Sequence, residues 1–467
     1  MNDGAVHIAV LSPVERSLVS FISRPWFDRV ATPAVARLFF PLSAAWAAAS
    51  VSGGDPDRFR ANLDDGQSRR AVPAGLLRLT AQAGERYAQA LSRWEEGLFG
   101  DIDANPGDQP ARLERVRLRH ARAFMGMRAG FLPGHLERSF PAARFAVEDE
   151  EVVSLRHRPR LSDPDGGFQP DLDTPVMESR AVRAGTTEFR WLRFDAPMGG
   201  KDLHPAEARV IERVGSTAKA TVLFLHGIGM ETEQWGEHPA IANWVLDQGF
   251  RVIEPHGPWH TRRALPGRYG GEPILGRGVG GLLDYSWTHV REVGRLIAWA
   301  RARDVAAGGE PGPVLLVGTS LGALTAMQLL SWAGSWPVQA RPDSALLIAP
   351  AASLVDVAFR GSLTGQMGVP DRLKAAGWTE DTVSHWARLL DAADAPCIAP
   401  NRICVALGTM DEITPFTSGR DLVRRWDIPA GNWWTREQGH FSVGLGIAAQ
   451  PDPLQQAVAV TLEAVGQ

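Results

Sequence analysis

A serine stands between two glycines in the segment VLLVGTSLGALTA, residues 314–326. The run 314–317 is short, apolar and half β-branched, which predicts a buried strand, and the residues after position 322 have the composition of a helix. Ser320 therefore falls on a turn of two or three residues between a strand and a helix. Gly318 and Gly322 let the chain cross closely at such a turn, so that the serine hydroxyl is presented above the sheet. This pattern is typical of a serine nucleophile.

Such a nucleophile needs a base to take its proton and an acid to orient that base. Downstream of Ser320 the sequence contains two histidines, His385 and His440. His385 falls within an apparent helix, whereas His440, in EQGHFSVG, follows the last predicted strand and is expected on a loop that reaches the serine. Asp411 follows the preceding strand, and we favour it over the adjacent Glu412 as the acid. The order serine, acid, histidine is the one expected for this turn in a parallel sheet.

The tetrahedral intermediate of such a reaction needs backbone N–H donors for its oxyanion. We expect one donor from Leu321, directly after the nucleophile. The second is expected from FLHGIGME, residues 224–231, where Gly227 lets the backbone approach the substrate and the N–H of Ile228 is the first choice. His226 is then expected to stabilise this loop.

Composition limits the function classes further. The chain has 467 residues, 44% of them hydrophobic and 22% charged, with a net charge of −4, which is typical of a globular protein with more than one domain. The charge gives no sign of a nucleic-acid partner. Two cysteines are too few for a disulfide framework and lack the spacing of a metal site. The beginning of the sequence lacks the features of a secretory signal. The longest apolar segment, 38–51, is interrupted by Pro41 and is shorter than the roughly 20 residues of a membrane span. These features predict a cytoplasmic protein.

The pattern of elements divides the chain into three parts. Residues 1–157 carry mainly helical signals, 158–178 are polar and rich in proline and indicate a linker or long loop, and strands alternate with helices over 179–467. Such alternation predicts an α/β fold, with a mostly parallel twisted sheet covered by helices on both faces. The helical stretch 352–395 is expected to be an insert that forms a cap over the site.

The segment from about 180 to 467 resembles the α/β-hydrolase superfamily, since Ser320, Asp411 and His440 match its catalytic triad in order and context. More narrowly, the motifs HGIGMETEQW, IEPHGPWHTRR, GTSLGALTA and GTMDEITP with EQGHFSVG resemble the family named for α/β-hydrolase domain-containing protein 18. The resemblance implies an α/β-hydrolase fold and acyl-ester substrates, lipid esters among them.

One further loop carries candidate substrate contacts. In EPHGPWHTRR, residues 254–263, we expect Trp259, His260, Arg262 and Arg263 to lie beside the active site and to contact substrate. His256 and His260 are four residues apart, but the prolines and glycine between and beside them exclude the helix that a zinc site would need. No metal and no cofactor is therefore expected. The glycine-rich stretches within 268–281 predict a flexible loop at the active site.

We therefore predict a serine hydrolase that cleaves carboxylic esters through an acyl-enzyme. A peptidase, amidase or thioesterase with the same triad remains an alternative, as does a non-catalytic binding protein of the same fold. The expected substrate is a small-molecule or lipid ester. Large apolar side chains between Phe21 and Trp46 must be buried on something, so we expect the N-terminal helices to pack against the hydrolase domain or a second subunit. Peripheral contact with a membrane and a homo-oligomer formed through these helices stay open.

Overall fold

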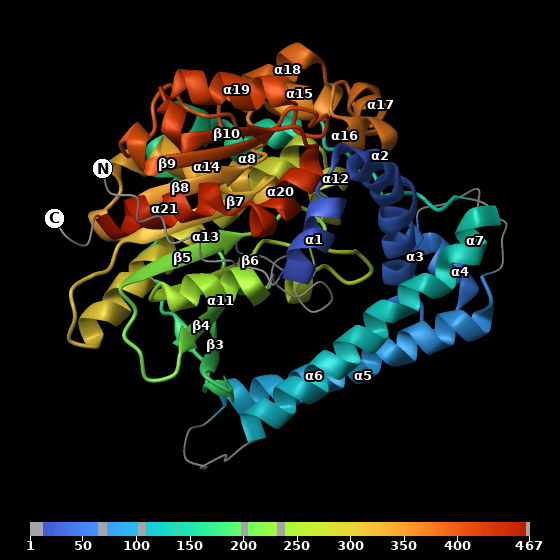
Figure 1. The fold of residues 1–467 in the computed structure, drawn as a ribbon. Helices are drawn as coiled ribbons and strands as arrows, with labels where there is room; N and C mark the ends of the chain where they lie inside the picture. Colours follow the sequence, from blue (N-terminus) through green and yellow to red (C-terminus); the bar gives the residue numbers. More distant parts are fainter. Residues whose placement is uncertain are drawn as a thin grey trace.

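The computed structural model describes residues 13–63, 72–100, 109–137, 139–197, 204–230 and 239–463. In these residues the strands form one sheet in the order β1-β3-β4-β6-β5-β7-β8-β9-β10, with β2 paired to β3 (Figure 1). The strands are β1 (Met177–Glu178), β2 (Val182–Ala184), β3 (Thr187–Phe194), β4 (Ala206–Arg213), β5 (Ala220–Leu225), β6 (Phe250–His256), β7 (Val314–Thr319), β8 (Ser344–Ile348), β9 (Ile403–Gly408) and β10 (Trp433–Arg436).

The sheet has an antiparallel and a parallel part. The pairings of β3 with β4 and of β4 with β6 are antiparallel, whereas β6, β5, β7, β8, β9 and β10 pair in parallel. The carboxyl ends of parallel strands meet at one edge of a sheet, where ligands bind in open α/β folds. This edge therefore determines where the loops after β5, β7 and β9 come together.

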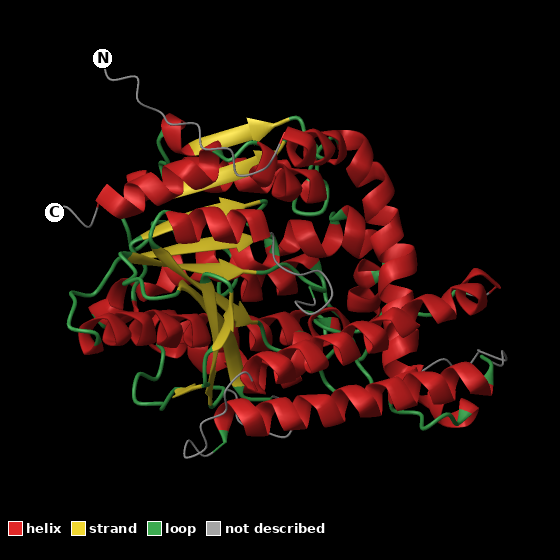
Figure 2. Cartoon of the chain, turned by 60° about the horizontal axis from the view of Figure 1, so that its bottom comes forward, coloured by secondary structure: helices red, strands yellow, loops and turns green. Residues whose placement is uncertain are grey.

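The parallel strands are buried on both faces because alternate residues enter two different clusters. Leu223 and Leu316 belong to the larger cluster with residues of α13, α14 and α19, whereas their neighbours Val222 and Leu315 pack with residues of α11, α20 and α21. The helices on the first face are α13 (Val279–Ala306), α14 (Leu321–Trp332) and α19 (Phe416–Arg425), and those on the second are α11 (Pro239–Asp247), α20 (His440–Ala449) and α21 (Asp452–Glu463). A helical layer on each face, as the sequence predicts, is confirmed (Figure 2).

The insert after β8 is helical, as expected. It contains α15 (Leu354–Phe359), α16 (Ser362–Gln366), α17 (Val369–Ala375) and α18 (Glu380–Ala387). His385 lies exposed on α18. Shorter 3-10 turns occur at η2 (Met127–Phe131), η3 (Thr261–Arg263), η4 (Ala333–Ser335), η5 (Val338–Ala340), η6 (Pro400–Arg402) and η7 (Ala430–Asn432).

The N-terminal region is helical and packs on the catalytic segment. Its helices are α1 (Pro13–Ile22), α2 (Pro25–Ala34), the π-helix η1 (Val35–Phe39), α3 (Phe40–Ser50), α4 (Pro56–Leu63), α5 (Ala74–Phe99), α6 (Gln109–Gly126) and α7 (Leu132–Glu137). The long helices α5 and α6 lie side by side, while α1 and α2 contact α20 (Figure 1). Phe40 is buried with its ring centroid 5.3 Å from that of Tyr269. These contacts agree with the expected packing of this region on the catalytic segment.

Two sequence interpretations are wrong in detail. The segment 158–178 is not a continuous loop, because α8 (Glu150–Ser162) extends into it and α9 (Pro164–Phe168) follows. Asp163 ends the first helix and caps the second, since its side chain accepts from the Gly166 N–H. The glycine-rich stretches within 268–281 form α12 (Glu272–Gly276) and the beginning of α13. Glycine there is required by close packing, because a Cβ at Gly276 or Gly281 would crowd a backbone carbonyl.

Pro41 does not interrupt the apolar N-terminal segment either. In the described residues, α2, η1 and α3 form one helical stretch, Pro25–Ser50, which by length and composition alone could cross a membrane and of which half is buried in the protein. The π-helical turn directly before α3 accommodates the proline, which has no N–H to donate. A buried core helix can have the same length and composition.

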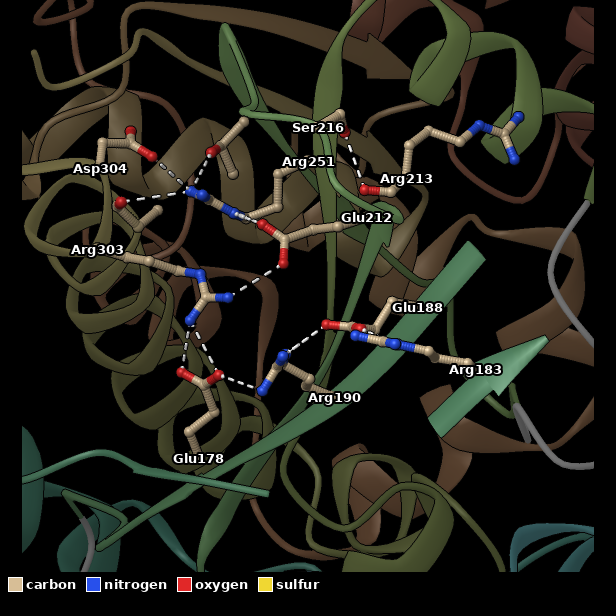
Figure 3. A network of polar contacts seen from close by, with 12 residues as sticks. Glu178, Arg183, Glu188, Arg190, Glu212, Arg213, Ser216, Arg251, Arg303 and Asp304 are labelled. Atoms are coloured by element: carbon tan, nitrogen blue, oxygen red, sulfur yellow. Dashed lines mark hydrogen bonds and ion pairs between the residues drawn. The ribbon is translucent and has the colours of Figure 1, made fainter. Parts of the chain in front are cut away.

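A network of ion pairs ties the antiparallel end of the sheet to α13 (Figure 3). Arg251 on β6 pairs with Glu212 on β4 at 2.7 Å and with Asp304 on α13 at 3.0 Å. Arg303 on α13 pairs with Glu178 on β1 at 2.7 Å. These ion pairs connect β1 and β4 to β6 and α13, and they lie away from the carboxyl ends of β7 and β9.

Candidate active site

Ser320 occupies a strained turn at the carboxyl end of β7. Its φ is +55°, a backbone conformation that residues other than glycine rarely adopt. Its N–H donates to the Ile348 carbonyl at 2.9 Å. A Cβ at Gly318 would collide with the backbone of Gly322, and a Cβ at Gly322 would collide with the carbonyl of Leu225. The close crossing that the sequence predicts for these two glycines is confirmed.

The structure brings His440 and Asp411 to this serine. His440 Nε2 lies 2.9 Å from Ser320 Oγ, and His440 Nδ1 lies 2.8 Å from Asp411 Oδ2. The sequence predicts His440 on a loop, and this is wrong in detail. His440 is the first residue of α20. A helix start holds the ring more firmly than a loop would, because its backbone is fixed by the following turns. The three residues that the sequence predicts as a catalytic set therefore form one continuous line of hydrogen bonds, although their role in catalysis stays a prediction.

The Asp411 carboxylate is held by its own turn. Oδ1 accepts from the N–H groups of Ile413 and Thr414, each at 2.9 Å, and Oδ2 lies 2.9 Å from Thr414 Oγ1. That hydroxyl also lies 3.1 Å from His440 Nδ1. The adjacent Glu412 is exposed, whereas Asp411 is buried. Sequence reasoning missed Thr414, although an aspartate whose side chain bonds the backbone two and three residues later is a known turn signal.

The electrostatics of His440 favour its charged form. Burial lowers the pKa of His440, but the charge of Asp411 and its hydrogen bond outweigh this, with a contribution from the charge of Asp28, so that the pKa lies above its ordinary value of 6.5. A raised pKa strengthens the imidazole as a proton acceptor, which is the property that a general base for Ser320 needs.

The residues expected to supply backbone donors for an oxyanion lie beside the serine. Leu321 is the first residue of α14, and the N–H groups of a first helical turn have no partner within the helix. A Cβ at Gly227 would lie 3.7 Å from Ser320 Cβ, and Ile228 lines the same cavity as Ser320. The part of the HGIGMETEQW motif from residue 231 onward lies outside the described residues. The three residues thus lie beside Ser320, and their role as oxyanion donors stays a prediction.

An apolar cavity of about 130 Å³ opens beside Ser320. The cap insert forms much of its wall, through residues of α15, α16 and α17, and the beginning of α13 forms another part. The lining residues are Ile228, Ile274, Leu275, Gly278, Val279, Leu282, Ser320, Leu321, Leu324, Ala351, Leu354, Val357, Ala358, Leu363, Thr364, Val369, Leu373, Ile413 and Thr414. None of these residues is charged, so the cavity suits an uncharged apolar group.

The candidate substrate contacts after β6 do not lie in this cavity. Trp259 and His260 are buried in the turn that follows β6. Arg262 pairs with Glu207 at 2.9 Å and lies 4.6 Å over the ring of Trp94. Arg263 is fully buried and pairs with Glu292 at 2.6 Å. The two arginines thus pair with carboxylates that are distant in the chain, which the sequence alone could not show.

The histidines near this turn are structural. His226 Nε2 accepts from the Gly257 N–H at 3.0 Å, and His260 Nδ1 lies 2.9 Å from the Pro258 carbonyl oxygen. His226 thus links the loop after β5 to the loop after β6, in agreement with its expected part in that loop. His256 ends a strand rather than lying on a helix. Among the described residues, no group of three or more His, Cys, Asp or Glu side chains could hold a metal ion.

Comparisons with known proteins agree with this architecture. The model of the alpha/beta hydrolase family matches residues 222–452. No curated protein matches this chain in sequence. Among solved structures, an acetyl xylan esterase from a Paenibacillus species is 16% identical, with a TM-score of 0.44 and with 68% of this chain and 95% of that chain covered. Acetyl xylan esterase 1 from a Thermoanaerobacterium species is 14% identical, with a TM-score of 0.42 and with 67% and 96% covered.

The family match and the strand order both indicate an α/β-hydrolase fold. The match begins in β5 and ends at the start of α21, and it includes the elements that carry Ser320, Asp411 and His440. The antiparallel strand β4 beside six parallel strands, with helices on both faces, is the fold that the sequence predicts. Residues 222–452 therefore match the alpha/beta hydrolase family model, and the sheet with its two helical layers has the α/β-hydrolase fold.

Proposed function

We propose that the protein is a serine hydrolase that cleaves carboxylic esters with an apolar acyl chain. The observation that carries this proposal is the line from Ser320 Oγ through the His440 ring to the Asp411 carboxylate, with distances of 2.9 and 2.8 Å. In this line His440 takes the serine proton as Oγ attacks the ester carbonyl, and Asp411 stabilises the imidazolium that forms. The N–H groups of Leu321 and Ile228 are the proposed donors to the oxyanion.

The reaction proceeds in two halves. When the tetrahedral intermediate collapses, the imidazolium of His440 gives its proton to the leaving alkoxide, and the acyl group stays on Ser320 Oγ. A water molecule then loses a proton to the neutral His440 and attacks the acyl carbonyl. Collapse of this second intermediate returns the proton to Oγ and releases the carboxylic acid.

The chemistry of the cavity supports the acyl part of the proposal. Leu324, Leu354 and Val357 are among its apolar lining residues, and polar groups are confined to three hydroxyl side chains. Burial of each CH₂ group contributes about 0.8 kcal/mol, so longer acyl chains should gain rate until the cavity is filled. Within the superfamily, the four motifs of the sequence support a narrower kinship to the family named for α/β-hydrolase domain-containing protein 18.

A series of p-nitrophenyl esters tests this function. We expect hydrolysis of the hexanoate ester with a kcat/KM at least about tenfold above that of the acetate, since four additional CH₂ groups enter an apolar cavity. A p-nitrophenyl ester with a carboxylate at the end of its acyl chain should be a poor substrate. The Ser320→Ala variant is the matched control. Absence of hydrolysis for every ester, or unchanged hydrolysis by the variant, would contradict the proposal.

A further inference from the structure

The N-terminal helix α2 reaches the helix that carries His440. Asp28 of α2 is only 9% exposed, and its Oδ1 accepts from the N–H of Phe441 at 2.6 Å and from the N–H of Ser442 at 3.3 Å. These two N–H groups belong to the first turn of α20, which begins with His440. A carboxylate at this place satisfies donors that have no partner within the helix and interacts favourably with the helix dipole. Asp28 therefore caps the helix that begins with the histidine.

Gly439 makes room for this cap. A Cβ at position 439 would collide with the carboxyl group of Asp28. The φ of Gly439 is −94°, a value open to any residue, so the backbone conformation does not require a glycine. The close approach of Asp28 requires it. Two residues far apart in the sequence are thus fitted to each other beside His440.

A second contact from the N-terminal region holds the same segment. The Gln438 side chain donates from Nε2 to the Ser23 carbonyl at 2.6 Å. Helices α1 and α2 both pack against α20, as Figure 1 shows, and Val19 of α1 packs on the cluster that contains Val443 and Ile447. The residues on both sides of His440 are therefore held by a part of the chain that lies outside the family match.

Two carboxylates from different elements act on the charge of the His440 ring. Asp411 comes from the loop after β9 and is hydrogen-bonded to Nδ1, whereas Asp28 comes from α2 and acts through its charge and through the backbone. Asp28 Oδ2 is buried and has no hydrogen-bond partner in the described part of the chain. Its negative charge favours the imidazolium form of His440 and contributes to the raised pKa of that histidine.

We infer that Asp28 is a positioning residue for His440, so that the N-terminal helices complete the catalytic apparatus of the superfamily fold. This inference depends on the proposed function for its kinetic consequences. It has a physical consequence that does not depend on substrate, namely the position and protonation of the His440 ring.

Two substitutions separate the hydrogen bonds of Asp28 from its charge. Asp28→Asn keeps an oxygen that accepts from Phe441 and Ser442 but removes the charge, whereas Asp28→Ala removes both. Asp149→Ala is the matched control, because the exposed Asp149 side chain caps α8 by accepting from the Val152 N–H at 2.9 Å, and in the described residues it makes no hydrogen bond to α20, Asp411 or Ser320. The kcat and KM of each variant for p-nitrophenyl hexanoate are measured per active site titrated with a fluorophosphonate. The pKa of His440 is measured by NMR titration of its ring in the protein without substrate.

We expect Asp28→Ala to lower kcat about tenfold with KM within about twofold, since the loss of a cap frees the first turn of α20. We expect Asp28→Asn to keep kcat within about threefold and to shift the pKa of His440, and the acidic limb of the pH profile, to lower pH. Asp149→Ala should change neither. Unchanged kcat and an unchanged His440 pKa in both Asp28 variants would overturn the inference. Equal losses of kcat in both variants without a pKa shift would also overturn it, because the role would then be structural alone.

The experiment also distinguishes this inference from the proposed function. If the wild-type protein hydrolyses no ester, the proposed function fails, and the NMR titration still decides whether Asp28 acts on His440. If Asp28→Ala does not fold, the kinetics and the titration of Asp28→Asn decide, because that variant keeps the cap.

Discussion

The surroundings of His440 and of the histidines behind the loop after β5 differ in one respect that explains their different chemistry. His260 and His440 are buried and His226 is partly buried, yet desolvation lowers the pKa of His226 to about 3 and that of His260 well below its ordinary value, whereas the pKa of His440 is raised. His440 faces the carboxylate of Asp411, while His226 and His260 face each other at a ring distance of 4.7 Å and bond to backbone groups. Burial alone thus gives a neutral structural histidine, and a carboxylate partner is needed to make a base.

A nearby carboxylate is not sufficient either, as His289 shows. Its Nδ1 lies 3.5 Å from Glu292, but burial still lowers its pKa. Both oxygens of Glu292 are bonded to Arg263, at 2.6 and 2.9 Å, so the arginine already balances the charge. In the described residues, the carboxylate of Asp411 is held by backbone N–H groups, by Thr414 and by His440, and no arginine or lysine pairs with it. Its charge therefore remains available to the imidazole.

The largest effects are expected from replacing His440, which should affect activity, and His260, which should affect stability. We expect His440→Ala to lower kcat by at least about 10⁴-fold, because the members of a triad act as a unit. His260→Ala should lower the free energy of unfolding by about 1–3 kcal/mol through its lost hydrogen bonds and packing, and it should lower kcat far less. Ester hydrolysis and urea denaturation measure the two effects. A His440→Ala variant that retains more than a tenth of the wild-type kcat would contradict the comparison.

The acid can be tested with its neighbour as the control. Asp411→Asn should lower kcat by about 10³- to 10⁴-fold, since an amide no longer stabilises the imidazolium and favours the wrong tautomer of His440. Glu412→Gln should change kcat by less than about twofold, because Glu412 is exposed. Steady-state kinetics at pH 8 with p-nitrophenyl hexanoate measure both. Similar losses of kcat in the two variants would contradict the assignment of Asp411 rather than Glu412 as the acid.

The pH dependence should show one acidic limb that belongs to His440. The base acts in its neutral form, and its pKa in the folded protein is raised. kcat/KM should therefore be constant above this pKa and should fall about tenfold per pH unit below it. The midpoint of this fall should lie above pH 6.5. His226, whose pKa is about 3, should not contribute over this range. A profile from pH 5 to 9 that stays flat down to pH 5.5 would be inconsistent with this assignment.

The smallest effect on activity is expected at Arg262, which the sequence suggested as a substrate contact. Because its side chain pairs with Glu207 and covers Trp94, Arg262→Ala should lower the free energy of unfolding by about 3 kcal/mol. Its kcat and KM should stay within about twofold of the wild-type values at 20 °C. A tenfold rise in KM with unchanged stability would instead restore the substrate role.

Local signals in the sequence explain which parts of this picture could be predicted. The turn around Ser320 has its own glycines, and Asp411 follows a strand of six buried residues, so their places depend on nearby residues alone. The order of strands and helices over 179–467 follows from the alternation of apolar runs. Asp28 gives no such signal, because it meets Phe441 across 413 residues and is an ordinary aspartate within an amphipathic helix.

Two other features depend on packing and could not be read from composition. Gly444 and Gly446 are unfavourable in a helix interior, so helix propensity alone does not predict the helix that begins at His440. A Cβ at Gly446 would crowd the Gln438 side chain, which explains the glycine there. The stretch 268–281 is rich in glycine because α12 and α13 pack closely, and the same residues in an isolated peptide would favour a loop. Tertiary contacts decide the structure in both places.

Labelling with a fluorophosphonate, followed by peptide mass spectrometry, tests the central claim most directly. The claim is that Ser320 is a nucleophile activated by His440 and Asp411. Incubation of the wild-type protein at pH 8 should give one phosphonyl adduct per chain, on the peptide that contains Ser320, and p-nitrophenyl hexanoate should slow its formation. The His440→Ala variant should react far more slowly, and the Ser320→Ala variant should remain unlabelled. A wild-type protein without an adduct at Ser320, or a Ser320→Ala variant labelled at the wild-type rate, would contradict the account.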